Sequence, residues 1–363
     1  MKKSTKQMIS KSSFSSANSS SIYSVKRTCR CICIIALFFG LAMHNSYGQS
    51  SSCNSGKIDP RVAFLANIFP DLTMEQENAM TIEQRRKSTP PNLHPVPADK
   101  MQWIKITADS IPVVIYKPDS ITQGMLPVII DYHGGGFIAP LQPWMYNIGY
   151  GMANYYHAVV FQIDYDVAPE HRFPAAITSS YEAFKWLSVH ANIFGGDTSR
   201  IMVSGASAGA NIAAVMALMA KKDGIVGRIK FVSLFCPLVD NPINSRYESY
   251  KKSAKGYVVT KNDAIWAIKN YVGSEATDTN DYRLFPIRAK SFESLPPTLV
   301  FTAEFDVLRD EGEAYANKLI AAGVPTSYRC FPGELHVLAG LPDDAEEWKI
   351  MVGDTKAFMK KYW

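Results

Sequence analysis

The chain has 363 residues, of which 47% are apolar, 12% aromatic and 20% charged. This balance is typical of a globular protein and excludes a disordered or fibrous chain. The formal net charge of +5 arises at the start of the chain, because the first 48 residues hold seven Lys or Arg and no Asp or Glu. Without those seven, 31 basic and 33 acidic residues remain, a formal charge of −2. This near-neutral remainder gives no reason to expect a nucleic-acid partner.

Residues 1–48 predict a leader that is removed on export. Basic residues at 26–30 precede an apolar run at 32–42, about 11 residues long. That is the size of a signal-peptide core and too short to span a bilayer, which needs about 20 residues. Small residues on either side of Tyr47 place the cleavage site after Gly48. We therefore expect a periplasmic or secreted protein; the alternative is an uncleaved anchor, and only then would the protein contact a membrane.

The cysteines predict neither a metal centre nor a disulfide framework. Three of the six lie in the leader, at positions 29, 31 and 33. The other three form no C-x-x-C pair and have no His-rich partner stretch; they are Cys53, Cys236 and Cys330. We expect no bound metal and at most one disulfide.

Residues 49–363 are expected to form one α/β domain, which begins with helix and loop. Apolar side chains recur at helical spacing from Val62 to Phe69, and Pro70 ends the pattern. Residues 73–87 predict a second, more polar helix. Prolines between positions 90 and 97 then mark a stiff connection.

After this segment, strands and helices alternate. Eight β-rich runs lie at Trp103–Thr107, Val113–Lys117, Val128–Tyr132, Val159–Asp164, Ile201–Ser204, Lys230–Phe235, Thr298–Thr302 and Ser327–Phe331. The main helical stretches between them are Trp144–Tyr155, Ala175–His190, Ala208–Lys221 and Glu311–Ala322. Unbroken apolar strands between helices indicate a mostly parallel, eight-stranded sheet with helices on both faces. The segment 240–290, with a helix around Asp263–Tyr271, interrupts the alternation and predicts a cap over the carboxyl ends of the strands.

Ser207 is the predicted nucleophile. The run Gly205-Ala206-Ser207-Ala208-Gly209 is a G-x-S-x-G motif, with a strand before it and a helix after it. Such a turn holds the serine in a strained conformation above the sheet, and only glycines leave room for it. A turn without a catalytic role is the structural alternative.

A glycine run after another strand predicts an oxyanion hole. The strand Val128–Tyr132 leads directly into His133, Gly134, Gly135 and Gly136. Ester hydrolysis puts negative charge on the carbonyl oxygen, and fixed N–H donors stabilise that charge. The expected donors are the amides of Gly135, Gly136 and Ala208, whereas Gly134 shapes the turn. A flexible loop or phosphate cradle is the alternative, but no P-loop motif follows.

His336 is the predicted general base and Asp306 its orienting acid. In the hydrolase order Ser–acid–His, only one histidine lies beyond Ser207. The acid should follow the preceding strand, where Asp306 stands, with Glu304 and Asp310 as rivals.

Together these motifs resemble the hormone-sensitive lipase family, the family IV bacterial esterases of the α/β-hydrolase superfamily. The matching stretches are 132–137, 164–176, 205–209, 306–312 and 331–336. The resemblance implies an α/β-hydrolase fold without a cofactor and a cap built from residues of about 57–100 and 240–290. It also implies that Tyr165 and Glu170 brace the loops near the hole. The chain departs from the family pattern at Ala206, 166–167 and 337–338, so the substrates of family members do not carry over.

We therefore expect a serine carboxylic-ester hydrolase that acts on short-chain, small-molecule acyl esters through an acyl-enzyme intermediate. An esterase that removes acetyl groups from carbohydrate is one alternative, and an amidase is another. From a different class, the fold can serve as a non-catalytic binding module. That alternative predicts a missing triad residue, and the sequence retains all three.

Overall fold

The structure is a computed structural model that describes residues 53–68, 72–87, 95–108, 110–120, 123–253, 257–273 and 280–363. The predicted leader at 1–48 lies outside the described residues. Contacts between Cα atoms group the chain from Gly48 onward into a unit of its own. Within the described ranges, no helix has the combination of length and apolar character that a bilayer span requires.

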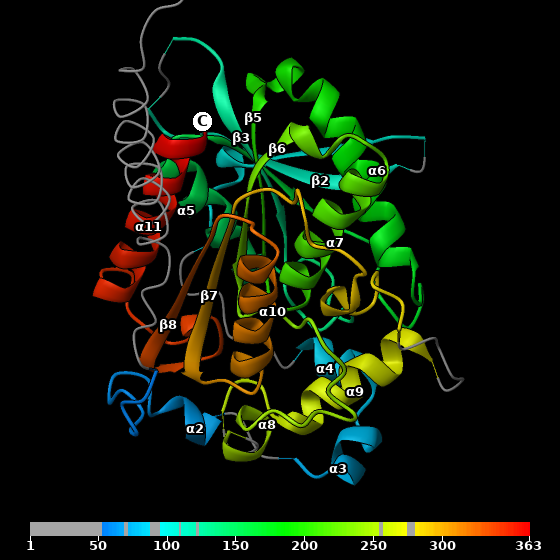
Figure 1. The fold of residues 1–363 in the computed structure, drawn as a ribbon, viewed down its shortest axis with the longest axis vertical. Coiled ribbons are helices and arrows are strands. Elements are labelled where there is room, and N and C mark those ends of the chain that lie inside the picture. The colour runs from blue at the N-terminus through cyan, green and yellow to red at the C-terminus, as the bar shows by residue number, and fades with distance from the viewer. Residues whose placement is uncertain are drawn as a thin grey trace, which may run out of the picture. The chain divides into compact units, whose positions relative to one another are not determined.

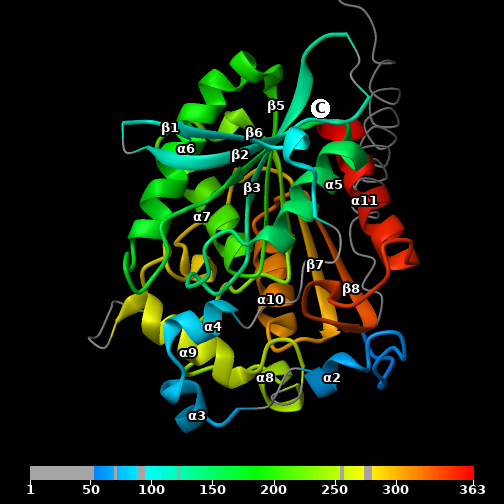
Figure 2. The ribbon, with the colours of Figure 1, turned by 180° about the vertical axis from the view of Figure 1, so that it is seen from behind.

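An eight-stranded sheet forms the centre of this unit, in the order β1-β2-β4-β3-β5-β6-β7-β8 (Figures 1 and 2). The pairs β1–β2 and β2–β4 are antiparallel, and every other pair is parallel. The strands are β1 Gln102–Ile106, β2 Ile111–Tyr116, β3 Leu126–Tyr132, β4 Val159–Ile163, β5 Gly196–Ala206, β6 Ile229–Phe235, β7 Thr298–Phe305 and β8 Thr326–Leu335. Each lies where the sequence predicted a strand, and the predicted α/β-hydrolase fold is confirmed.

Helices cover both faces of the sheet. Neighbouring residues of a strand point to opposite faces, and where both are apolar, each face must be buried. Ile130 packs in a core with helices α6, α7 and α10, whereas its neighbour Ile129 packs in a second core with α5 and α11. Figures 1 and 2 show these two groups on either side of the sheet. Their bounds are α5 Tyr146–Tyr156, α6 Ala175–His190, α7 Ala208–Lys222, α10 Arg309–Ala321 and α11 Glu346–Tyr362.

Five further helices gather at the end of the sheet where β7 and β8 finish (Figures 1 and 2). They are α2 Leu65–Ile68, α3 Met74–Ala79, α4 Ile82–Lys87, α8 Ser249–Lys252 and α9 Lys261–Val272. The Asn262 side-chain amide donates to the carbonyl of Leu72 over 2.8 Å, and Arg85 pairs with Asp263 at 2.7 Å. These contacts join the segments 57–100 and 240–290, which are far apart in sequence.

The single helix expected over 73–87 is two helices. Thr73 caps the first, and its side chain accepts from the Gln76 amide in a capping box. Thr81 and Gln84 make the same reciprocal pair at the start of the second helix. The second T-x-x-Q pattern therefore starts a new helix and ends the first.

Short 3₁₀ helices complete the described elements: η1 Ala98–Lys100, η2 Pro143–Met145, η3 Ala191–Phe194, η4 Val226–Arg228, η5 Pro286–Arg288 and η6 His336–Leu338.

Candidate active site

Ser207 occupies a sharp turn between β5 and α7. Its backbone has φ 57° and ψ −121°, which is strained for a residue with a Cβ. A Cβ at Gly205 would collide with the backbone of Gly209, and a Cβ at Gly209 would collide with the carbonyls of Tyr132 and His133. The two glycines therefore permit the turn and let the first turn of α7 approach the end of β3.

The glycine run after β3 lies against this turn. A Cβ at Gly134 would come within 3.3 Å of the Ala206 carbonyl oxygen and 3.4 Å of the Ser207 Cβ. Gly135 and Gly136 both have positive φ, at 107° and 64°. None of the hydrogen bonds found among the described residues uses their amide N–H groups. The loop can therefore present free donors next to the serine.

His133 braces this loop. Its Nδ1 lies 2.7 Å from the Gly134 carbonyl oxygen, and its ring stacks on Tyr165 with centroids 4.2 Å apart. The Tyr165 hydroxyl donates to the His133 carbonyl over 2.8 Å. Burial lowers the pKa of His133 to about 4, so the ring is neutral at physiological pH.

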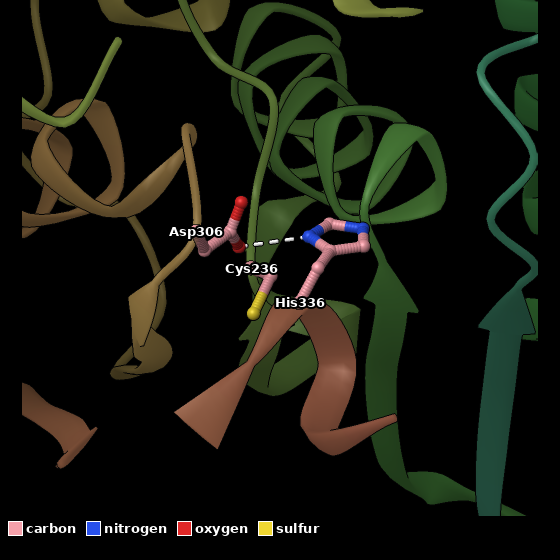
Figure 3. Close-up of side chains that lie close together, drawn as sticks. All are labelled: Cys236, Asp306 and His336. Carbon is pink, nitrogen blue, oxygen red and sulfur yellow. Dashed lines mark hydrogen bonds and ion pairs between the residues drawn. The ribbon is translucent and has the colours of Figure 1, made fainter. Parts of the chain in front are cut away.

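Asp306 and His336 form a buried pair (Figure 3). The Nδ1 atom of His336 lies 2.8 Å from a carboxylate oxygen of Asp306. Asp306 is fully buried and His336 is 4% exposed. Asp306 follows the end of β7, and His336 begins the turn η6 directly after β8. Since these parallel strands are neighbours, their carboxyl ends bring the two side chains together.

The two rival acids make other contacts. Glu304 accepts hydrogen bonds from the amides of Ser55, Gly56 and Gly333, at 2.8 to 2.9 Å. Burial opposes ionisation, but the Ser55 hydroxyl, which also donates to Glu304, and these amides outweigh it and hold the pKa of Glu304 below its usual value. Asp310 accepts from the Ser249 amide. Of the three carboxylates, Asp306 is the one that the structure pairs with His336.

Helices α4 and α9 pack on the glycine loop. A Cβ at Gly136 would lie 3.0 Å from the Cβ of Ala267, which is on α9. Phe137 stacks on Tyr271 of the same helix, with centroids 4.1 Å apart. The guanidinium of Arg86, on α4, donates to the Ile138 and Ala168 carbonyls and pairs with Glu170. The family resemblance gave Glu170 a bracing role, and its partner is this arginine.

Sequence reasoning missed two contributors to the site. The sequence predicts no role for Cys236, one of three cysteines without a motif, yet it lies beside Asp306 and His336 (Figure 3). Arg86 was noted only as part of a polar helix. Neither had a local signal, because the groups that each contacts are distant in sequence.

Comparison with known proteins agrees with the fold. Residues 129–340 match the family model described as the alpha/beta hydrolase fold. The carboxylesterase NlhH of Mycobacterium tuberculosis is 32% identical over 289 residues, 77% of this chain and 88% of the relative. The arylesterase of Saccharolobus solfataricus is 30% identical over 298 residues, 81% of this chain and 94% of the relative.

Solved structures give the same result. An ester hydrolase from the metagenome of Lake Arreo, complexed with a derivative of bipyridine phosphonate, superposes with a TM-score of 0.71. It is 31% identical, and the match covers 83% of this chain and 98% of that one. The chain therefore belongs to the α/β-hydrolase family, in the hormone-sensitive lipase-like branch of family IV esterases.

Proposed function

We propose that this protein is a serine carboxylesterase that hydrolyses short-chain acyl esters through an acyl-enzyme intermediate. The observation that carries the proposal is the buried Asp306–His336 pair, 2.8 Å apart, in a chain whose strained Ser207 turn lies against the glycine loop. The esterase relatives and neighbours support the same class of reaction.

In the proposed mechanism, the Ser207 hydroxyl attacks the carbonyl carbon of the ester while His336 accepts its proton through Nε2. The Asp306 carboxylate holds Nδ1 in its protonated form and stabilises the imidazolium. Collapse of the tetrahedral intermediate expels the alcohol, which takes its proton from His336, and leaves the acyl group on Ser207. Water then repeats the two steps and releases the acid.

The oxyanion of each tetrahedral intermediate is stabilised by the amides of Gly135, Gly136 and Ala208. The first two donate to no other group among the described residues, and Ala208, the first residue of α7, has no acceptor within its own helix. Each such donor contributes about 3–4 kcal/mol to the transition state.

The test is hydrolysis of p-nitrophenyl acetate and butyrate by Ser207→Ala. We expect kcat/KM to fall by about 10⁴-fold or more, because the nucleophile is lost while the fold is retained. The matched control is Ser199→Ala, which removes an exposed serine of the same strand and should retain full activity. Esterase activity of Ser207→Ala close to that of the wild type would refute the serine mechanism.

The acyl preference is tested with the p-nitrophenyl acetate, butyrate, octanoate and laurate series. The close packing of α9 on Gly136 and Phe137, beside the glycine loop, supports a short acyl group. We expect the highest kcat/KM for acetate or butyrate. Faster release of acetate from acetylated xylan than from p-nitrophenyl acetate would instead identify a carbohydrate acetyl esterase.

We also propose that the protein is exported and that its leader is removed after Gly48. In support, Cys53 and Cys330 form a disulfide, a bond that persists in oxidising compartments. Protein recovered outside the cytoplasm should begin at Gln49 by N-terminal sequencing. Recovery of the full-length chain in the membrane fraction would indicate an uncleaved anchor instead.

A further inference from the structure

Cys236 lies directly beside the Asp306–His336 pair. It follows the last residue of β6, is completely buried, and is outside the disulfide. Its sulfur, a carboxylate oxygen of Asp306 and a ring nitrogen of His336 all lie within 4.8 Å of one another. Figure 3 shows the thiol next to the hydrogen-bonded pair. The reaction proposed above makes no use of this thiol.

The backbone around Cys236 connects the strands that carry the other site residues. The Cys236 amide donates to the carbonyl of Phe301 on β7 over 2.8 Å. The carbonyl of the preceding residue, Phe235, accepts from the Ser207 amide, also at 2.8 Å. Cys236 has φ 47°, so its backbone adopts the left-handed conformation, in a turn directly after β6. This turn is therefore fixed to both the serine and the acid-bearing strand.

The sulfur also contacts the loop that carries the base. The amide of Val337, the residue after His336, donates to the Cys236 sulfur over 3.3 Å. Val337 has φ 51°, so this loop too is held in a sparsely populated conformation. A sulfur is a weak acceptor, but Cys236 is completely buried, so water does not compete for its sulfur.

We propose that Cys236 is a positioning residue of the Asp306–His336 pair. Its S–H donates to the Asp306 carboxylate while its sulfur accepts the Val337 N–H, so one side chain orients both acid and base. This proposal rests on the proposed function, because the proposed function is what gives Asp306 and His336 their roles in the triad.

The protonation state of the thiol agrees with a donor role. Burial raises the pKa of Cys236 well above its usual value, and the neighbouring negative charge of Asp306 raises it further. The side chain is therefore a neutral S–H at the pH at which an esterase works. Its proton points to the carboxylate because a buried carboxylate is the strongest acceptor within reach.

The experiment compares Cys236→Ala and Cys236→Ser by the pH dependence of kcat/KM and by kcat. The alanine variant loses donor and acceptor, so kcat should fall about tenfold with little change in KM. It also removes one donor from the Asp306 carboxylate, which keeps the Leu308 amide and the imidazolium as its partners. The imidazolium then feels more of the negative charge, so the acidic limb of the pH profile should move to higher pH. Serine restores both groups and should recover most of kcat, with the limb at or below the wild-type position.

Controls separate a positioning role from a structural one. Ser233→Ala removes a buried hydroxyl from β6, the strand that Cys236 follows, and should keep the wild-type kcat and pH profile. Wild-type kcat in both Cys236 variants would overturn the proposal. So would an equal loss in both with an unmoved acidic limb, since this indicates packing alone. Ser207→Ala, assayed in parallel, reports separately whether the proposed function itself fails.

Discussion

Glu334 is a buried carboxyl group, two residues before His336, that shares one arginine with two other acids. Its Oε1 lies 3.5 Å from Arg61 Nη2, which is closer to Asp59 and Glu347, at 2.6 and 2.7 Å. Its Oε2 is buried and has no hydrogen-bond partner among the described residues. Burial, with the negative charges of Glu347 and Asp59, raises the pKa of Glu334 to about 7.

This raised pKa predicts that the protein loses stability as the pH rises. The folded state binds a proton at Glu334 between its ordinary pKa of 4.5 and about 7, whereas the unfolded state releases it. The contribution of Glu334 to the free energy of unfolding should therefore be fully present below pH 4.5. It should be lost as the pH rises from 4.5 through about 7, a loss of up to about 3 kcal/mol.

Glu334→Gln removes this dependence. Denaturation by urea, measured for both proteins from about pH 5 to about pH 8, should show the variant gaining stability relative to the wild type as the pH rises. Groups common to both proteins, such as His133 with its pKa of about 4, cancel in the difference. A difference that does not change with pH would show that Glu334 is ionised throughout.

At the residue scale, the sequence was sufficient to place Ser207, Asp306 and His336 as candidates. The order of the motifs along the chain is set by the strand order, and each residue follows a recognisable strand. Cys236 and Glu334 could not be found in this way. Their importance comes from burial beside groups far away in the sequence, and neither residue type marks its own surroundings.

At the scale of elements, helix α4 is tied to the glycine loop by one side chain. Arg86 donates to the carbonyls of Ile138 and Ala168, at 2.9 and 3.1 Å, and pairs with Glu170. A planar guanidinium can satisfy three acceptors at once, whereas an ammonium cannot match this geometry.

Arg86→Lys should therefore lower kcat about five- to tenfold, because the loop that carries the proposed oxyanion donors is less firmly held. The matched control is Lys87→Met on the same helix, which loses only an exposed pair with Glu83 and should keep its activity. Unchanged kcat in Arg86→Lys would show that the loop is held without this contact.

Some elements were harder to predict than others. The apolar strands and the helices between them were located because their patterns are local. Helix α11 was not predicted, although Trp348, Met351, Thr355, Phe358 and Tyr362 repeat at helical spacing. Only Thr355 and Phe358 of this helix are buried, so its apolar face is narrow and its charged residues obscure the pattern.

At the scale of the whole molecule, a disulfide between Cys53 and Cys330 links distant parts of the described chain. The two residues are 277 positions apart, and Cys330 lies on β8, the strand that leads to His336. Sequence reasoning allowed one disulfide but assigned no pair, since three cysteines permit three pairings. Only the tertiary structure brings these two together.

Breaking this disulfide should lower the free energy of unfolding by about 2–4 kcal/mol, because the unfolded chain regains the freedom of a very long loop. The measurement is urea denaturation of Cys53→Ser against the wild type, both purified from an oxidising compartment. The same chain, made without residues 1–48 in a reducing cytosol, should expose two more reactive thiols after unfolding than the oxidised protein does. Equal stability of Cys53→Ser and wild type would show that noncovalent contacts alone fix the segment.

Those noncovalent contacts have a consequence for the order in which the enzyme is made. The Glu304 carboxylate on β7 accepts hydrogen bonds from the amides of Ser55 and Gly56, and also from the amide of Gly333 on β8. On the ribosome, Ser55 emerges about 250 residues before its partner. The segment around Ser55 can therefore make these contacts only after β7 and β8 have been synthesised. The turn that begins at His336 also forms only then, when nearly the whole polypeptide is present. A nascent chain should stay inactive until that moment, so activity cannot precede the synthesis of β8 and the turn after it.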